Sequence, residues 1–211
     1  MREFEIRPDP DDPRLSTLVP GIDHEGNAIE TAVVTERPLT LFLNAREIVT
    51  MMTIGDHPDL LAIGYLLNQG MLRADDDITG IDHAEDIDTI VVRTRRQTDY
   101  EEKLRKKVQT SGCAQGTVFG DLMSEIAIHG CVLCREDRPL VYMEDVGRHN
   151  AVDKIAGFMF RNRVPAADKI FYTTGRLTSE MVIKTVKMGI PILVSRSASR
   201  PGASSLPDAR G

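Results

Sequence analysis

Residues 169–195 read KIFYTTGRLTSEMVIKTVKMGIPILVS, and this stretch decides the fold class. Lys169 to Thr173 is rich in β-branched and aromatic residues, which predicts a strand. Ser179 to Met188 has apolar residues at helical spacing and is followed by Gly189, a residue type that ends helices. Pro191 to Ser195 is a short apolar strand. A strand, a helix and a strand in this order form a βαβ unit, so the sequence predicts a parallel sheet and an α/β fold.

Two segments upstream show further core patterns. Val132-Leu133 and Leu140 to Met143 flank the turn-like Glu136 to Pro139, which predicts a β hairpin. Ala151 to Phe160 places its apolar residues on one face of a helix. Together with the βαβ unit, these segments predict a layered α/β core.

The N-terminal half is predicted to contain strands and one helix. Ala32 to Val34 and Leu39 to Leu43 are expected to pair around the turn at Arg37-Pro38. A helix is expected between Asp56 and Gly70, with a proline in its first turn. Ile87 to Arg93 is expected to be a strand.

These patterns divide the chain into four parts. Residues 1–30 are rich in Pro, Asp and Gly and lack periodicity, which predicts a loose N-terminal arm. Residues 31–108 are expected to form a smaller α+β part, and residues 109–196 an α/β core that includes a cysteine loop. Residues 197–211 are dominated by small and polar residues, which cannot offset their ordering entropy, so this tail is predicted to be disordered.

Composition limits the class of protein. The 211 residues are 41% hydrophobic and 27% charged, which is enough for a core without disulfide staples. The net charge of -6 does not suit a nucleic-acid-binding surface. We see neither a secretory signal at the N-terminus nor an apolar run of the roughly 18–20 residues that a membrane helix needs. With three cysteines, an odd number, the chain is expected to be cytoplasmic.

Cys113 lies in the Gly-rich segment Ser111 to Thr117, SGCAQGT. Small neighbours let the backbone approach a ligand closely, which suits a cysteine presented on a loop. A cysteine that carries persulfide sulfur needs such a position, because its sulfur has to reach a donor and then an acceptor. The other interpretation is a glycine-rich connector that happens to contain a cysteine.

Cys131 and Cys134 form a C-x-x-C pair two residues after His129. With Cys113 these residues could make a Cys₃His zinc site, or the pair could be a redox dithiol. The pair, however, lies in a predicted strand with apolar residues between the cysteines, and a chelating pair usually lies on a turn. Two partly buried structural cysteines are therefore the favoured interpretation, with no metal site.

The segment Glu144 to Asn150 is the densest polar cluster, and it lies between a predicted strand and a predicted helix. Asn150 could cap that helix. Arg148 and His149 are expected to bind an anionic ligand beside the backbone N–H groups of the helix start, because cations there bring no benefit to the helix dipole. The alternative is helix capping with local salt bridges.

The segment Thr173 to Ser179 has the same placement, after a strand and before a helix, where open α/β sheets bind ligands. The hydroxyl of Thr174, the backbone of Gly175 and the guanidinium of Arg176 suit contacts to phosphate. The spacing differs from that of a P-loop and of a G-x-G-x-x-G loop.

Two of these segments are very similar to the signature of one family: EDVGRHNAVDK, from Glu144 to Lys154, and TGRLTSEMVIK, from Thr174 to Lys184. The segments in the N-terminal half that also fit are Asn44, Met52 to Pro58 and Leu61 to Gly70. From about Glu36 to Ser197 the chain thus resembles the formate dehydrogenase accessory sulfurtransferases, the FdhD family.

The resemblance implies a function. It implies transfer of sulfur from a cysteine desulfurase to the bis-guanylyl molybdenum cofactor, Mo-bis(molybdopterin guanine dinucleotide), before that cofactor enters formate dehydrogenase. Cys113 would be the catalytic residue that carries the persulfide. The cofactor would be a transient client with no tightly bound group, held by Arg148, His149, Thr174, Gly175 and Arg176. The implied fold is a cytidine-deaminase-like α/β sandwich with a smaller second part, in a homodimer.

The sequence departs from the family pattern in the cysteine loop. Gly116 stands where the family has a second cysteine, so Cys113 has no resolving thiol beside it. The stretch between Gly120 and His129 is also short for the family, and the C-terminal tail differs from the family pattern. These departures leave a second hypothesis, a non-catalytic chaperone that binds the molybdenum cofactor or zinc without transferring sulfur.

Overall fold

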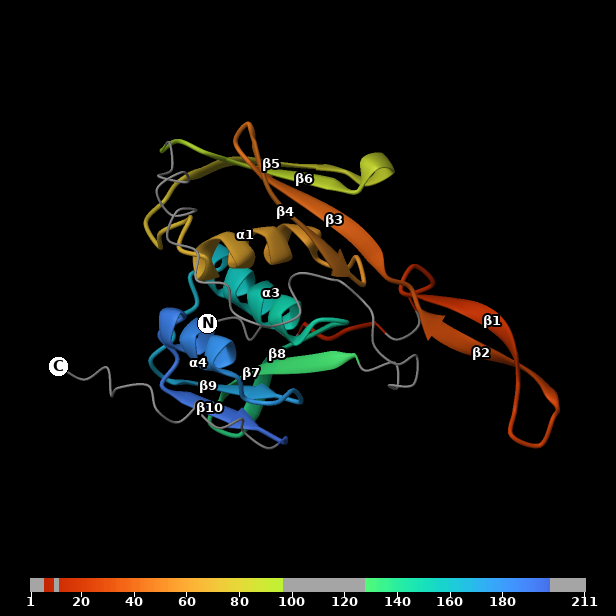
Figure 1. Ribbon diagram of the computed structural model, residues 1–211. Helices are drawn as coiled ribbons and strands as arrows, with labels where there is room; N and C mark the ends of the chain where they lie inside the picture. The colour runs from red at the N-terminus through yellow and green to blue at the C-terminus, as the bar shows by residue number, and fades with distance from the viewer. Residues whose placement is uncertain (1–5, 10–11, 97–127, 198–211) are drawn as a thin grey trace.

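The computed structural model describes residues 6–9, 12–96 and 128–197 (Figure 1). In this part of the chain, two four-stranded sheets lie on either side of a central layer of helices. The architecture is mixed α/β, as the sequence predicts. The further comparison with the cytidine-deaminase sandwich stays a prediction.

The first sheet is formed by the N-terminal half and has the order β4-β3-β6-β5. Its strands are β3 (Arg37–Leu43), β4 (Arg46–Thr53), β5 (Ile78–Ala84) and β6 (Thr89–Thr94). A short 3-10 helix, η1 (Glu85–Ile87), joins β5 to β6. Strand β3 runs antiparallel to β4 and parallel to β6. The predicted strand at Ile87 therefore begins two residues later, at Thr89.

The second sheet has the order β10-β9-β7-β8. Its strands are β7 (His129–Arg135), β8 (Arg138–Asp145), β9 (Lys169–Thr173) and β10 (Ile192–Ser195). Strands β7 and β8 form the predicted hairpin. Strands β9 and β10 are parallel and are joined through a helix, so the predicted βαβ unit is confirmed.

Within the described residues, three α-helices cover the sheets: α1 (Pro58–Asn68), α3 (Arg148–Arg161) and α4 (Ser179–Lys187). Helix α1 packs between the first sheet and α3, while α3 packs on β7 and β8. The two helices cross at glycines. A Cβ at Gly64 would lie 1.7 Å from the carbonyl oxygen of Asp153, and a Cβ at Gly157 would lie 2.0 Å from that of Leu60. Only glycine permits this separation, so the crossing fixes how the two sheets stand to each other.

The N-terminal region corrects two predictions. Residues 1–30 are not wholly a loose arm, because β1 (Ser16–Ile22) pairs antiparallel with β2 (Ala28–Val34). Nor do Ala32 to Val34 pair with Leu39 to Leu43: their partner is β1, and β3 pairs with β4 and β6. The alternating pattern identifies these strands but does not encode which edge each one joins.

Two of the predicted parts fall mainly outside the described residues. The tail lies outside the described residues except for Ser197, and the cysteine loop lies outside them entirely. The divisions after residues 30, 108 and 196 stay predictions. Among the described residues, no helix combines the length and the apolar character that are needed to span a bilayer.

Candidate functional site

The predicted ligand-binding segments meet at one edge of the second sheet. This edge contains the carboxyl ends of β8, β9 and β10 and the start of β7, because β7 runs antiparallel to β8 and β9. The backbone N–H of Thr174 donates to the carbonyl of Gly130 at 3.0 Å, which joins the loop after β9 to β7. The two polar segments that the sequence singled out are therefore neighbours in space, as the carboxyl ends of strands in an α/β sheet predict.

Thr174 holds the loop in place. Its Oγ1 accepts from the N–H of Gly130 at 2.9 Å and lies 3.3 Å from the carbonyl oxygen of the same residue. The sequence predicts that this hydroxyl contacts phosphate. In the structure this hydroxyl bonds the β7 backbone, and its contact with phosphate stays a prediction.

Two serines after β10 fix the loop from the other side. The Ser195 Oγ donates to the carbonyl of Gly175 at 2.7 Å, and the Ser197 Oγ donates to the carbonyl of Thr174 at 2.9 Å. Neither serine is predicted from the sequence to have this role. The signal for them is their place directly after a parallel strand that neighbours β9, where hydroxyls reach the adjacent loop.

Gly175 makes room for Arg148. A Cβ at position 175 would lie 3.0 Å from Cδ and 3.3 Å from Cβ of Arg148, so any larger residue would displace that arginine. The N–H of Gly175 donates to the Thr173 Oγ1 at 3.1 Å and is not available to a ligand. The role of Gly175 is to let the arginine side chain lie across the loop.

Arg148 and Arg176 make this edge positively charged. Arg148 is half-buried in the first turn of α3, and its Nε has no hydrogen-bond partner within the described segments. Arg176 is exposed. Burial, and then the charges of Arg148 and Arg176, lower the pKa of His129, which places both guanidiniums near the start of β7. Two arginines beside a helix N-terminus suit an anionic group.

His149 differs from the expectation that it adds positive charge. Its side chain is 14% exposed, and its Nε2 lies 3.3 Å from a carboxylate oxygen of Glu180 on α4. Burial, followed by the charges of Lys184 and Arg148, lowers the pKa of His149 to about 3. The imidazole is therefore neutral at neutral pH, and it can contribute hydrogen bonds but not charge to ligand binding.

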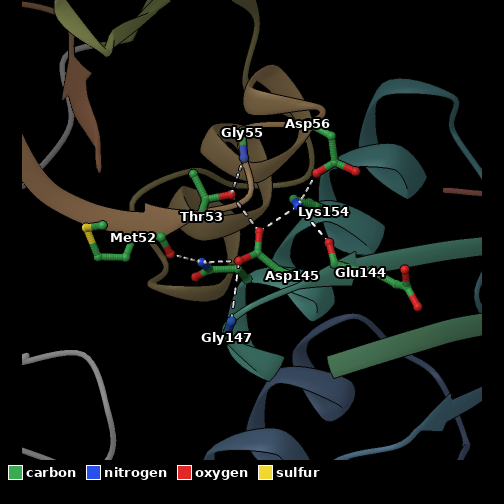
Figure 2. Close-up of polar contacts among 9 residues, drawn as sticks. Met52, Thr53, Gly55, Asp56, Glu144, Asp145, Gly147 and Lys154 are labelled. Atoms are coloured by element: carbon green, nitrogen blue, oxygen red, sulfur yellow. Dashed lines mark hydrogen bonds and ion pairs between the residues drawn. The ribbon is translucent and has the colours of Figure 1, made fainter. Parts of the chain in front are cut away.

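A buried carboxylate positions the start of α3 (Figure 2). Asp145, fully buried at the end of β8, accepts from the Thr53 hydroxyl at 2.6 Å and from the Asn150 amide at 3.0 Å. The N–H of Gly147 is 3.3 Å from the same carboxylate. Helix α3 begins at Arg148, so the Asn150 side chain does not cap it, contrary to the prediction: the Asn150 amide instead joins Asp145 to the carbonyl of Met52.

Lys154 completes this network from the second turn of α3. Its ammonium group is fully buried and lies 2.5 Å from Asp145 and in contact with Asp56, and it donates to the carbonyl of Glu144 at 2.8 Å. Thr53 and Asp56 come from the N-terminal half, so these bonds join the two sheets next to the arginine-bearing turn. A charge buried this completely requires such partners.

A second buried ion pair joins the three helices. Asp153 on α3 accepts from the Lys184 ammonium on α4 and from the Asn68 amide on α1, each at 2.7 Å. Burial raises the pKa of Asp153, and its two partners oppose that shift. This pair is not predicted from the sequence. The signal for it is Asp153 among the apolar residues of one predicted helix and Lys184 among those of the other.

Comparison with known proteins agrees with this arrangement. A model of the FdhD/NarQ family matches residues 34–127 and 123–209. The chain belongs to the FdhD/NarQ family. The "Sulfur carrier protein FdhD" of Bacillus subtilis is 29% identical over 82% of this chain and 80% of its own length. That of Geobacillus kaustophilus is 29% identical over 86% of this chain and 82% of its own length.

A solved structure is also similar to the fold of this chain. The crystal structure of a formate dehydrogenase accessory protein from Desulfotalea psychrophila has a TM-score of 0.68 to this chain at 27% identity. The similarity covers 89% of this chain and 86% of that protein. The similarity to the FdhD family that the signature segments indicate is thereby confirmed for the fold as well as for the sequence.

Two of the three cysteines of this FdhD/NarQ protein are held in β7. Cys131 is fully buried in the core, its Sγ is 3.5 Å from the Thr173 hydroxyl, and burial raises its pKa to about 12. Burial also raises the pKa of Cys134. Since the thiolate is the nucleophile, the raised pKa values make both residues weaker candidates for sulfur transfer, and their structural role stays a prediction.

The third cysteine lies in a different part of the chain from the other residues of the hypothetical metal site. Cys113 lies outside the described residues, so its predicted role is not addressed by the structure. His129, Cys131 and Cys134 lie along one strand. Within residues 6–9, 12–96 and 128–197, the His, Cys, Asp and Glu side chains form no group of three or more that could hold a metal ion.

Proposed function

We propose that this protein is a sulfurtransferase in the maturation of formate dehydrogenase. Cys113 takes sulfur from the persulfide of a cysteine desulfurase and passes it to Mo-bis(molybdopterin guanine dinucleotide). The main support is the family membership together with the state of the other thiols: Cys131 and Cys134 have raised pKa values, which leaves Cys113 as the candidate carrier. The relatives named sulfur carrier proteins point the same way.

The first chemical step is a thiolate exchange. The Cys113 thiolate attacks the terminal sulfur of the desulfurase persulfide, a new S–S bond forms, the old one breaks, and the desulfurase cysteine leaves as a thiolate. The delivery of this sulfur to the cofactor balances in electrons when the acceptor is reduced molybdenum. The terminal sulfur takes two electrons from Mo(IV) and becomes a sulfido ligand of Mo(VI), and Cys113 leaves as a thiolate. The carrier then returns to its starting state without a resolving cysteine, which fits Gly116 in the loop.

The client is polyanionic, and the arginine-rich edge of the second sheet fits it. Arg148 and Arg176 would pair with phosphate oxygens, and the N-terminal N–H groups of α3 add to the positive field. His149 would contribute a neutral hydrogen bond. Thr174 and Gly175 would act indirectly, by holding the loop and by making room for Arg148.

Mass spectrometry tests the carrier role. After incubation with a cysteine desulfurase and cysteine, the intact protein should gain the mass of one or more sulfur atoms at Cys113. The Cys113→Ala variant should lose this adduct. The matched control, Cys134→Ala, should keep it, because Cys134 is a partly exposed cysteine with a raised pKa. An adduct undiminished by Cys113→Ala would overturn the assignment.

A second candidate is a chaperone that binds the molybdenum cofactor or zinc without transferring sulfur. The observation in its favour is Gly116 in place of a second loop cysteine. Complementation of a strain that lacks its own FdhD protein separates the two. Loss of formate dehydrogenase activity with Cys113→Ala supports sulfur transfer, and full activity with that variant supports the chaperone.

The proposal includes the setting of the reaction. The partners are a cysteine desulfurase and formate dehydrogenase, the compartment is the cytoplasm, and the working form is a homodimer. The net charge of -6 gives no support to nucleic acid as a partner. The cytidine-deaminase-like arrangement of layers remains part of the proposal and awaits a structural comparison with that fold.

A further inference from the structure

The β1–β2 hairpin projects away from the rest of the molecule (Figure 1). Among the described residues, β1 and β2 pair only with each other. A two-stranded hairpin is marginally stable in water unless a further strand or a helix supports it. Some surface absent from the described chain is therefore expected to complete this sheet.

The side chains of the hairpin indicate the same need. Leu18 and Ile22 are 65% and 76% exposed, and Val19 and Ile29 are each 40% exposed. Leu18 and Ile22 lie on one face, while Val19 and Ile29 lie on the other, because successive residues of a strand alternate. Apolar residues on both faces of an exposed hairpin are typical of an interface.

The hydrogen bonds within the hairpin show which backbone groups point outward, where a further strand would pair. The Thr35 N–H donates to the Leu15 carbonyl, and the Asp23 N–H donates to the Asn27 carbonyl, so odd-numbered residues exchange the bonds within the hairpin. On β2 the backbone groups that point outward belong to Ala28, Glu30 and Ala32. On β1 the outer edge has Pro20 at its centre, which has no N–H to donate.

We propose that β2 pairs with β2 of a second copy of this chain, so that the two hairpins form one four-stranded antiparallel sheet. This inference rests on the homodimer in the proposed function and names its interface. A strand that pairs with itself across a two-fold axis is necessarily antiparallel, which gives an isologous contact. Glu30 is the single charged residue in the two strands, so the hairpin offers little for a partner recognised by charge and a second copy is favoured.

The charge of Glu30 and the overlap of the two strands together select the register. Pairing centred on Glu30 would place two carboxylates directly opposite each other, which is destabilising. Pairing centred on Thr31 overlays the whole of residues 28–34, places Glu30 opposite Ala32 of the second copy, and brings the two Thr31 residues together. The outward N–H and C=O groups of Glu30 in one copy then form two hydrogen bonds with those of Ala32 in the other copy.

Disulfide cross-linking tests this register. Two Thr31 residues in a non-hydrogen-bonded pair would have Cα atoms about 4.5 Å apart, which is within disulfide range. Oxidation of Thr31→Cys should give a covalent dimer. The control is Thr17→Cys, an exposed threonine on the same face of β1, whose two copies would be separated by both β2 strands. Wild-type protein oxidised in parallel corrects for its own three cysteines.

A proline substitution tests the edge. Ala32→Pro removes an outward N–H but leaves the bonds within the hairpin, so the mass in solution should fall from twice the chain mass of 23.4 kDa to that mass. A dimeric Ala32→Pro variant, or cross-linking of Thr17→Cys as strong as that of Thr31→Cys, overturns the interface. A monomeric wild type overturns the dimer as well, while sulfur loading of Cys113 still decides the proposed function. If Ala32→Pro fails to fold, the cross-linking result decides.

Discussion

Replacement of Lys154 by methionine tests the buried network that joins the two halves of the molecule. Lys154 is fully buried, and its ammonium contacts Asp145, Asp56 and the Glu144 carbonyl. Methionine has a similar length and fills the same space, so the change removes the charge with little loss of packing. Asp145 keeps the neutral donors of Thr53, Gly147 and Asn150 but loses its only cationic contact among the described residues.

The expected loss of stability is large. Breaking a buried ion pair by removing one partner costs about 3–5 kcal/mol, because the remaining charge stays buried. A domain has about 5–15 kcal/mol of stability in total. For a chain of this size, about 2–4 °C of melting temperature corresponds to 1 kcal/mol, so the melting temperature should fall by about 6–20 °C.

Urea unfolding and thermal melting measure this loss. The control is Arg161→Met, which removes an exposed arginine that pairs with Asp59 on the surface and should cost only about 0–1 kcal/mol. Adding Asp145→Asn to Lys154→Met should recover part of the loss, because the buried charge is then gone. The reasoning is refuted if Lys154→Met destabilises the protein no more than Arg161→Met does. It is also refuted if the losses in free energy of unfolding from Lys154→Met and Asp145→Asn simply add in the double variant.

Two further changes are predictable from the structure. Gly64→Ala places a Cβ 1.7 Å from a backbone oxygen of α3 and should destabilise the protein by about 3 kcal/mol or more in urea unfolding, whereas Gly80→Ala, whose nearest contact would be 3.8 Å away, should be close to neutral. The His149 pKa of about 3 lies below its value of about 6.5 in the unfolded chain, so the unfolded state binds more protons between these limits and stability falls as the pH falls below about 6.5. From pH 7 to pH 5 the wild type should lose up to about 2 kcal/mol more than His149→Gln does, and equal losses in the two proteins would contradict the buried, neutral imidazole.

Local pattern predicts the elements of the second sheet well. The β7–β8 hairpin, helix α3 and the βαβ unit all appear where apolar periodicity and turn residues place them. The two polar segments before α3 and α4 were also identified, since each follows a strand and precedes a helix. Sequence reasoning failed where pairing partners had to be chosen. Strand β2 was assigned to β3 because the two are close in the chain, but its partner is β1.

The sequence by itself thus determined the family, the α/β class and the sheet edge that holds Arg148 and Arg176, because short-range periodicity and motif order specify these features. Only the tertiary structure decided the electrostatics of that edge. His149 is neutral because α4 and neighbouring cations surround it, and Lys154 is tolerated in the core because Asp56, distant in the chain, reaches it. Burial and charge depend on which segments pack together in three dimensions, and a strand or helix pattern contains no information on its distant neighbours.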